Sequence, residues 1–78
     1  MFYVYILQLS DRTYYHGYSD NLKQRIMAHN IGSVESTKNL LPFTLVFYAS
    51  FSSKKNALDF EKYLKTTSGW AFRNKHLI

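Results

Sequence analysis

The stretch YYHGYSDNLKQR, residues 14–25, gathers three tyrosines around Gly17 and reaches Arg25 within one short segment. A guanidinium can hold two oxygens of one phosphate, and a neighbouring phenol can hydrogen-bond to the same group or exchange a proton with it. Aromatic packing is the alternative explanation, because tyrosine is an ordinary strand former. We interpret the segment as a candidate site for chemistry on a phosphate, provided that the surrounding elements bring these side chains together.

The surrounding sequence predicts one small α/β domain (of the α+β kind) over residues 1–78, with a three-stranded antiparallel sheet flanked by helices. Its order is ββα, a loop, then βα and a short helical end. The first strand is predicted to lie at the centre of the sheet, because it is apolar at both odd and even positions. The predicted strands are residues 2–9, 13–19 and 44–51, and the predicted helices cover about 20–30 and from Ser52 or Ser53 to about Thr67.

Capping and breaking residues support the two helices. Gly69 is predicted to stop the second helix, and the segment after it to form a last helical turn or two. Residues 31–43 show no clear period, and a loop of this length in so small a domain is usually functional or mobile. The candidate N-caps are Ser19 or Asp20 for the first helix and Ser52 or Ser53 for the second, and Gly32 can end the first helix.

The first predicted helix carries two polar residues beside its buried face. Leu22 and Ile26 define that face at helical spacing. Arg25 and His29 lie to the other side of Leu22 and are four residues apart, so their side chains are neighbours.

The second predicted helix carries a carboxylate on its apolar stripe. Ala57, Phe60 and Leu64 define the stripe, and Glu61 lies close to Ala57 around the helix. A carboxylate in such a position costs several kcal/mol unless a partner or a metal meets it. Glu61 therefore either binds a cation or forms a structural bridge to a buried arginine, for which Arg25 is a candidate.

Composition excludes several classes of function. The chain has no cysteine, which excludes disulfides, thiol nucleophiles and Cys-ligated zinc, and its three histidines lack the close pairing of a zinc site. Ten Lys and Arg residues against five Asp and Glu residues give a net charge of +5, which favours a polyanionic partner. The apolar N-terminal run is too short to span a bilayer and lacks the flanks of a signal peptide, so a cytoplasmic protein is expected.

The motif order resembles the GIY-YIG nuclease superfamily, most closely its short stand-alone members, which are similar to the UvrC N-terminal domain. The paired motifs are Tyr3-Val4-Tyr5 and Tyr15-His16-Gly17, with ten residues from Tyr5 to Tyr15 and ten more to Arg25. His29 and Glu61 fall where that family has a histidine and a metal-binding glutamate. The segments STKNLLPFTLVFYASFSSKKNALDFEKYLK and SGWAFRNK also resemble the short members, so the similarity covers nearly the whole chain.

Three positions depart from the family pattern. Tyr3 replaces the opening glycine, and His16 stands where valine or isoleucine is usual. His16 is expected to point to the opposite face of the sheet from Tyr15. Tyr18 stands where relatives carry a lysine, and we expect its hydroxyl to contribute to the site instead.

The resemblance implies hydrolysis of phosphodiester bonds with one divalent cation, Mg²⁺ or Mn²⁺. Glu61 would hold the cation and Arg25 the phosphate, while Tyr5 or Tyr15 would activate the attacking water. A phenol is a poor base unless positive charge stands beside it, and Arg25 and the cation would supply that charge. His29 would relay a proton or bind a phosphate.

The resemblance further implies a nucleic-acid substrate, expected to be DNA cut with low sequence specificity in repair or recombination. The expected substrate-binding residues are Gly17, which lets a backbone approach the strand, together with Tyr18, Lys38, Lys62 and Asn74. The main alternatives are a catalytically inactive nucleic-acid-binding module and a protein-interaction module of the same fold. The expected state is a monomer or a weak homodimer, with a protein partner as one source of specificity.

Overall fold

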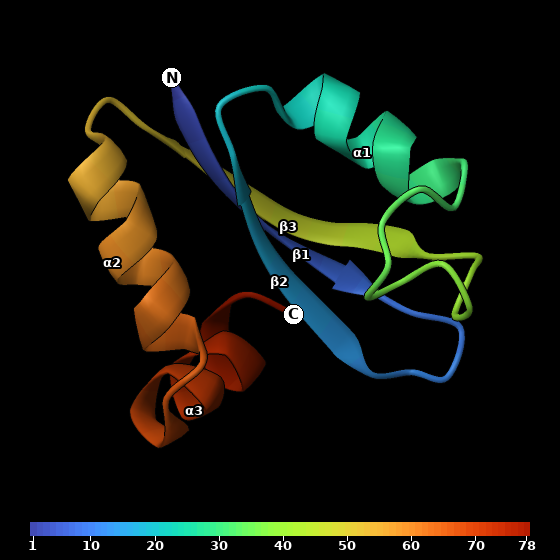
Figure 1. The fold of residues 1–78 in the computed structure, drawn as a ribbon. Helices are drawn as coiled ribbons and strands as arrows, with labels where there is room; N and C mark the ends of the chain where they lie inside the picture. Colours follow the sequence, from blue (N-terminus) through green and yellow to red (C-terminus); the bar gives the residue numbers. More distant parts are fainter.

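The computed structural model describes residues 1–78 as three strands and three helices. The strands are β1 (Phe2–Gln8), β2 (Tyr14–Ser19) and β3 (Thr44–Phe51), and the helices are α1 (Leu22–Asn30), α2 (Lys54–Leu64) and α3 (Thr67–His76) (Figure 1). The sheet order is β2-β1-β3, and both outer strands run antiparallel to β1. The predicted sheet and its central first strand are therefore confirmed.

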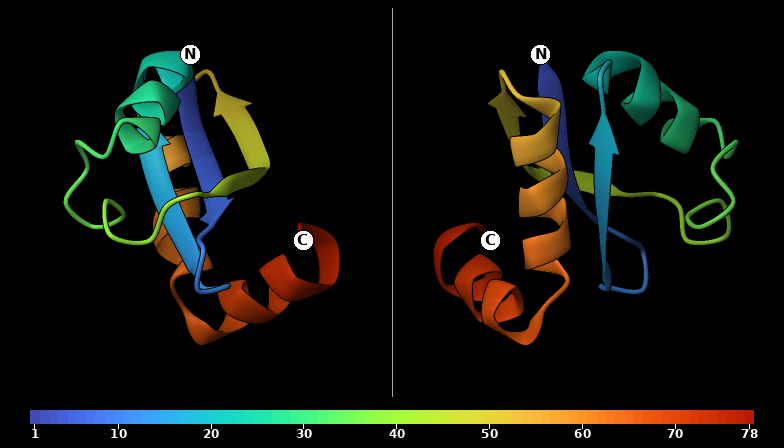
Figure 2. Two further views of the ribbon diagram at one scale, coloured as in Figure 1. Left: turned by 90° about the vertical axis from the view of Figure 1, so that its right-hand side faces the viewer. Right: turned by 60° about the vertical axis from the view of Figure 1, so that its left-hand side comes forward.

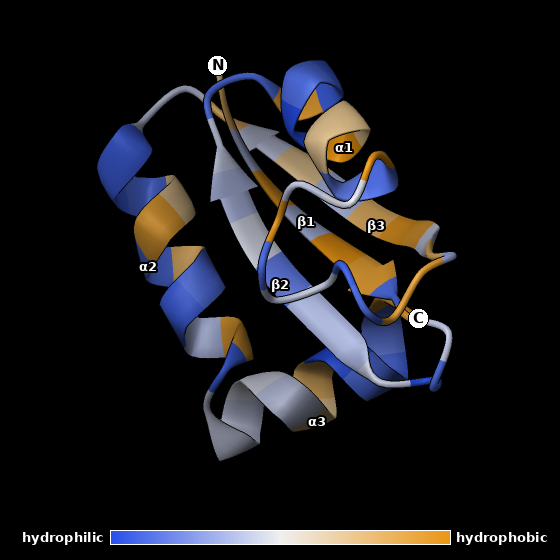
Figure 3. Cartoon of the chain, turned by 45° about the vertical axis from the view of Figure 1, so that its right-hand side comes forward, coloured by the Kyte–Doolittle hydropathy of each residue, from blue (hydrophilic) through white to orange (hydrophobic).

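The sheet separates two helical layers (Figure 2). Side chains of β1 alternate between these layers, as the two-residue period of a strand requires. Tyr5 and Leu7 pack with residues of α1, whereas Val4 and Ile6 pack with residues of α2. Burial on both faces explains why β1 is apolar at successive positions, and Figure 3 shows this hydrophobic centre between more hydrophilic helices. No helix of the protein has the length and apolarity needed to cross a membrane.

The predicted cap of the first helix is wrong by one or two residues. The side chain of Asn21 accepts a hydrogen bond from the backbone N–H of Gln24 at 3.1 Å, and α1 begins at Leu22. Ser19 instead accepts a hydrogen bond from the backbone N–H of Asn21, so it closes the turn that precedes the cap. The end signal is confirmed, because Gly32 follows the helix with a φ of 78°.

The predicted role of Gly69 as a helix stop is also wrong. Ser53 caps α2 as expected, but α2 ends at Leu64, and Thr66 then caps a separate ten-residue helix that contains Gly69. A Cβ at Gly69 would lie 1.8 Å from the carbonyl oxygen of Tyr63. Glycine is therefore needed here because the two helices meet closely, and not because the chain stops being helical.

Candidate functional site

Tyr5 occupies the centre of the sheet face that α1 covers, and its side chain is fully buried. Its register partner across the sheet is Gly17. A Cβ at Gly17 would lie 2.2 Å from Cζ of Tyr5, so the phenol ring occupies the space that any other residue would fill. The ring of Tyr5 thus covers Gly17 on this face, and the expectation that Gly17 admits a nucleic-acid backbone stays a prediction.

His29 connects Tyr5 to the loop between α1 and β3. Its Nε2 lies 2.7 Å from the hydroxyl of Tyr5, and its Nδ1 lies 2.8 Å from Oγ1 of Thr37. All three side chains are fully buried. Burial, and then the charge of Arg25, lowers the pKa of His29, so the ring is neutral and one nitrogen donates while the other accepts. Both ring nitrogens of His29 are occupied by protein partners here, and its expected roles, a proton relay through Tyr5 or a contact to phosphate, stay predictions.

Arg25 lies between the two phenols. Its Nε–H points at the hydroxyl of Tyr5 over 3.4 Å, which is a long contact, and the hydroxyl of Tyr15 also stabilises its charge. The contact with Tyr5 is the main cause that raises the pKa of Arg25. The ion pairs of this protein are Lys38–Glu35, Lys55–Asp59 and Lys65–Glu61, so Arg25 pairs with no carboxylate. A half-buried guanidinium without an acidic partner is available to an anionic ligand.

Tyr15 completes a cluster with Tyr5, Arg25, His29 and Thr37, which we call the Tyr5 cluster, and it lies at the more accessible side of that cluster. Its ring centre lies 6.3 Å from that of Tyr5 and 5.1 Å from that of His29, which it meets edge-on. Tyr15 is half-buried, whereas Tyr5 is not exposed at all. Burial raises the pKa of Tyr5 more than the hydrogen bond from Arg25 lowers it, so Tyr5 is a neutral phenol in the free protein.

Glu61 reaches this region from the other helical layer. Its side chain is 19% exposed, and its only ion pair is a loose one of 3.6 Å with Lys65, one turn further along α2. Its charge is nevertheless among those that raise the pKa of Tyr5. The bridge to Arg25 that the sequence allowed is absent, so the carboxylate has no strong protein partner. One carboxylate of this kind, completed by water and phosphate oxygens, suits Mg²⁺ or Mn²⁺.

Two residues that the sequence placed near the site, Tyr18 and Asn74, lie on the side of the sheet away from Tyr5. Tyr18 packs against the Val4–Ile6 side of the sheet, with α2. Asn74 lies on α3, where its Oδ1 accepts hydrogen bonds from Arg73. Tyr18 and Asn74 therefore do not join the Tyr5 side of the sheet, because a strand alternates its faces and α3 packs with α2, and their roles toward nucleic acid stay predictions. His16 also contacts Arg73, which confirms that it points away from Tyr15. The departures from the family pattern at His16 and Tyr18 therefore do not alter the residues of the Tyr5 cluster.

Two predicted substrate-binding lysines lie at the surface. Lys38 is partly neutralised by an ion pair of 3.0 Å with Glu35. Lys62 is exposed on α2, next to Glu61 in sequence. Neither forms a hydrogen bond or an ion pair with Tyr5, Tyr15, Arg25 or His29, and their roles toward nucleic acid stay predictions.

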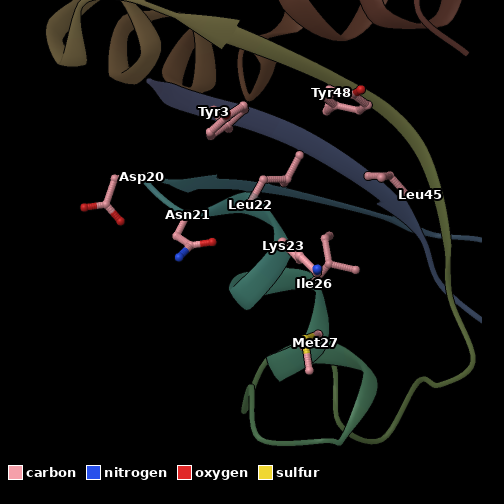
Figure 4. A pocket seen from close by; sticks show the side chains of 9 residues that line it. All are labelled: Tyr3, Asp20, Asn21, Leu22, Lys23, Ile26, Met27, Leu45 and Tyr48. Atoms are coloured by element: carbon pink, nitrogen blue, oxygen red, sulfur yellow. The ribbon is translucent and has the colours of Figure 1, made fainter.

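A hollow of about 570 Å³ lies on the other side of α1, between this helix and strands β1 and β3 (Figure 4). Its lining includes Tyr3, Leu22, Ile26 and Tyr48 but none of the five candidate catalytic residues. We therefore place the candidate chemistry at the Tyr5 cluster and not in this hollow.

Comparison with known protein families assigns this chain to a family. The model of the GIY-YIG catalytic domain matches residues 1–75. The chain belongs to the GIY-YIG family.

Relatives of this GIY-YIG chain agree with the assignment. It is 39% identical over 64 residues to UPF0213 proteins of Streptococcus pyogenes serotypes M5 and M3, with 81% of this chain and 70% of theirs covered. Its fold resembles the solution structure of a UPF0213 protein from Bacillus halodurans, with a TM-score of 0.61 and 32% identity, over 96% of this chain and 84% of that one. The family is one of nucleases, which implies nucleic-acid binding.

Thr37 is the one polar member of the Tyr5 cluster that the sequence analysis did not indicate. It lies in the segment without a period, eight residues after His29. A buried threonine in such a loop has no pattern of its own, because its role depends on how the loop folds back. The candidate signal was the loop's length, which suggested a function without naming a residue.

Proposed function

We propose that this protein hydrolyses phosphodiester bonds in nucleic acid, with DNA as the substrate and one divalent cation as cofactor. The observation that carries the proposal is the cluster of Tyr5, Tyr15 and His29 around Arg25, a guanidinium that has no acidic partner. A partly buried guanidinium that no carboxylate neutralises is available to an anionic ligand. A phosphate diester is the anion that the family membership favours.

The substrate would be held first by Arg25. Its planar fork can bind two oxygens of the scissile phosphate, and its Nε is directed by the hydroxyl of Tyr5. Negative charge spreads over these oxygens in the transition state, so a fixed guanidinium stabilises the transition state more than the ground state.

A phenol beside Arg25 would take the proton of the attacking water. Tyr15 has the more accessible position. Tyr5 has two neighbours that can donate to its oxygen, Arg25 and the Nε2 of His29, and both would favour its phenolate form. If the hydroxyl of Thr37 donates to Nδ1 of His29, Nε2 carries the proton and donates to Tyr5. Comparing Tyr5→Phe with Tyr15→Phe assigns the base, because only the base variant loses the chemical step while keeping substrate affinity.

Glu61 would hold the cation. When bound, Mg²⁺ or Mn²⁺ would neutralise charge on the phosphate and its leaving oxygen. The weak ion pair with Lys65 can open without leaving a deeply buried charge, because Lys65 is exposed. The cluster contains groups that suit a phosphate and not base edges, so we propose low sequence specificity, as repair or recombination requires.

Cleavage of DNA with Mg²⁺ or Mn²⁺, with and without EDTA, tests the activity. In an active protein, Arg25→Lys should lower the cleavage rate by about two orders of magnitude, because lysine keeps the charge but loses the fork. Binding of uncleaved DNA should hardly change. Glu61→Gln should abolish metal-dependent cleavage and leave the fold intact.

Lys75→Gln, an exposed change of charge on α3, is the matched control and should keep the cleavage rate. A wild-type rate in Arg25→Lys would refute the proposed role of the guanidinium. DNA binding without cleavage under any of these conditions would instead support a non-catalytic binding module.

A further inference from the structure

The face opposite the Tyr5 cluster holds a second guanidinium, and this one is almost fully enclosed. Arg73 of α3 is 2% exposed and forms no ion pair. Its Nε and Nη2 donate to Oδ1 of Asn74 at 3.1 and 2.9 Å, and its Nη1 lies 3.2 Å from Nε2 of His16. An arginine can only donate, so His16 accepts and is neutral. The charge of Arg73 is thus solvated by neutral groups and compensated by none.

Two aromatic rings enclose this guanidinium. The central carbon of the guanidinium, Cζ of Arg73, lies 4.5 Å from the ring centre of Tyr14 and 5.0 Å from that of Trp70. The indole lies against the cation on one side, and Trp70 as a residue is still 57% exposed. An exposed indole fixed in this way is a preformed surface for stacking, because little side-chain freedom is left to lose when a flat ligand binds.

Basic side chains lie on both sides of the indole. Trp70 lines a cleft of about 480 Å³ together with Arg12 and Arg73, and it also lines a second hollow of about 460 Å³ together with Lys65. No aspartate or glutamate lines either hollow. A flat ring therefore finds a stacking surface, and negatively charged groups on either side of that ring find cations.

We infer that Trp70, Arg12 and Lys65 form a binding site for single-stranded nucleic acid, in which a base stacks on Trp70 and the flanking phosphates approach Arg12 and Lys65. Arg73 supports the site from behind by fixing the indole and adding its uncompensated charge. An aromatic platform in a basic groove is the usual basis of sequence-tolerant strand binding. The inference shares its ligand class with the proposed function but does not require that this protein cleave anything.

The sole tryptophan of the chain makes the site directly observable. A decamer of thymidine, titrated in EDTA so that nothing is cut, should quench the fluorescence of Trp70 to saturation. With two phosphates neutralised, log K should fall against log[salt] with a slope of about −1.4.

Variants at exposed positions avoid disturbing the buried Arg73. Arg12→Gln keeps a side chain of similar length and should reduce the salt slope by about 0.7. Lys54→Gln, a distant exposed change of the same charge, should not. With a fluorescein-labelled decamer and anisotropy as the readout, Trp70→Ala should lower the affinity at least about fivefold, provided that its circular dichroism stays native.

Absence of quenching at millimolar decamer would overturn the inference, and so would equal behaviour of Arg12→Gln and Lys54→Gln. Cleavage is measured separately on the same preparation. If the decamer quenches Trp70 fluorescence but the protein does not cleave DNA, this binding site stands and the proposed nuclease function is refuted. If the protein cleaves DNA but its fluorescence is not quenched, the nuclease function stands and this binding site is refuted.

Discussion

Gly17→Ala should destabilise the protein strongly, although it adds one methyl group. Gly17 has no left-handed φ, so alanine meets no backbone penalty there and would ordinarily stabilise a chain by about 0.4–1 kcal/mol. The new Cβ, however, would lie 2.2 Å from Cζ and 2.3 Å from the hydroxyl oxygen of Tyr5. The ring must therefore move by about an ångström or more, since carbon atoms in contact are about 3.5–4 Å apart.

The ring of Tyr5 is not free to move. It is fully buried, and its hydroxyl is bonded to His29 at 2.7 Å. Forcing extra volume into such a core costs about 1–3 kcal/mol, and breaking the buried hydrogen bond adds about 1–3 kcal/mol. We expect a net loss of about 2–5 kcal/mol in the free energy of unfolding, which is a large part of the stability of a domain of this size.

Urea unfolding of the single and double mutants measures this loss and its cause. In a Tyr5→Leu background the clashing atoms are gone, so adding Gly17→Ala should cost less than about 1 kcal/mol, or stabilise. A full cost in both backgrounds would refute the argument, because the clash with Tyr5 could not then be its origin. A Gly17→Ala single mutant as stable as the wild type would also refute the argument.

Two further predictions follow from buried polar contacts. Burial, with help from Arg73 and Lys65, lowers the pKa of His16 to about 4, so the unfolded chain binds more protons than the folded one between about pH 6.5 and 4. Stability should therefore fall as the pH drops through this range, by about 1–2 kcal/mol after allowing for partial exposure, and His16→Gln should remove that part of the slope in pH-dependent urea melts. Thr37→Val should lower the free energy of unfolding by about 1–3 kcal/mol, because it leaves Nδ1 of His29 buried without a partner. Thr37→Ser keeps the hydroxyl and should stay near the wild type in thermal melts. Equal melting of the valine and serine variants would show that the hydroxyl contributes nothing to stability.

The sequence predicted the sheet because the strand patterns are local and strong. Residues 2–9 are rich in strand formers and mostly apolar at both odd and even positions, as expected of a strand covered on both faces, and β1 is indeed the central strand. The buried faces of both helices followed from helical spacing alone, as the packing of Leu22 and Ala57 shows. Helix ends were less certain: Asn21 and Thr66 had to be chosen among neighbouring polar residues, and Gly69 looked like a stop until the contact with Tyr63 was known.

Motif spacing determined which residues were candidates for the site, because Tyr5, Tyr15, Arg25 and His29 stand at fixed intervals on elements that the sequence identifies. Only the tertiary structure decided what each one contacts. The loop had to fold back to bring Thr37 within 2.8 Å of His29. The packing of α2 on the sheet had to place Glu61 where its charge acts on Tyr5 but where it forms no ion pair with Arg25. The strand period likewise moved Tyr18 to the other face, and α3 carried Asn74 to Arg73. Local patterns record the environment of one element, whereas these contacts join residues that are distant in the chain, and no local preference encodes them.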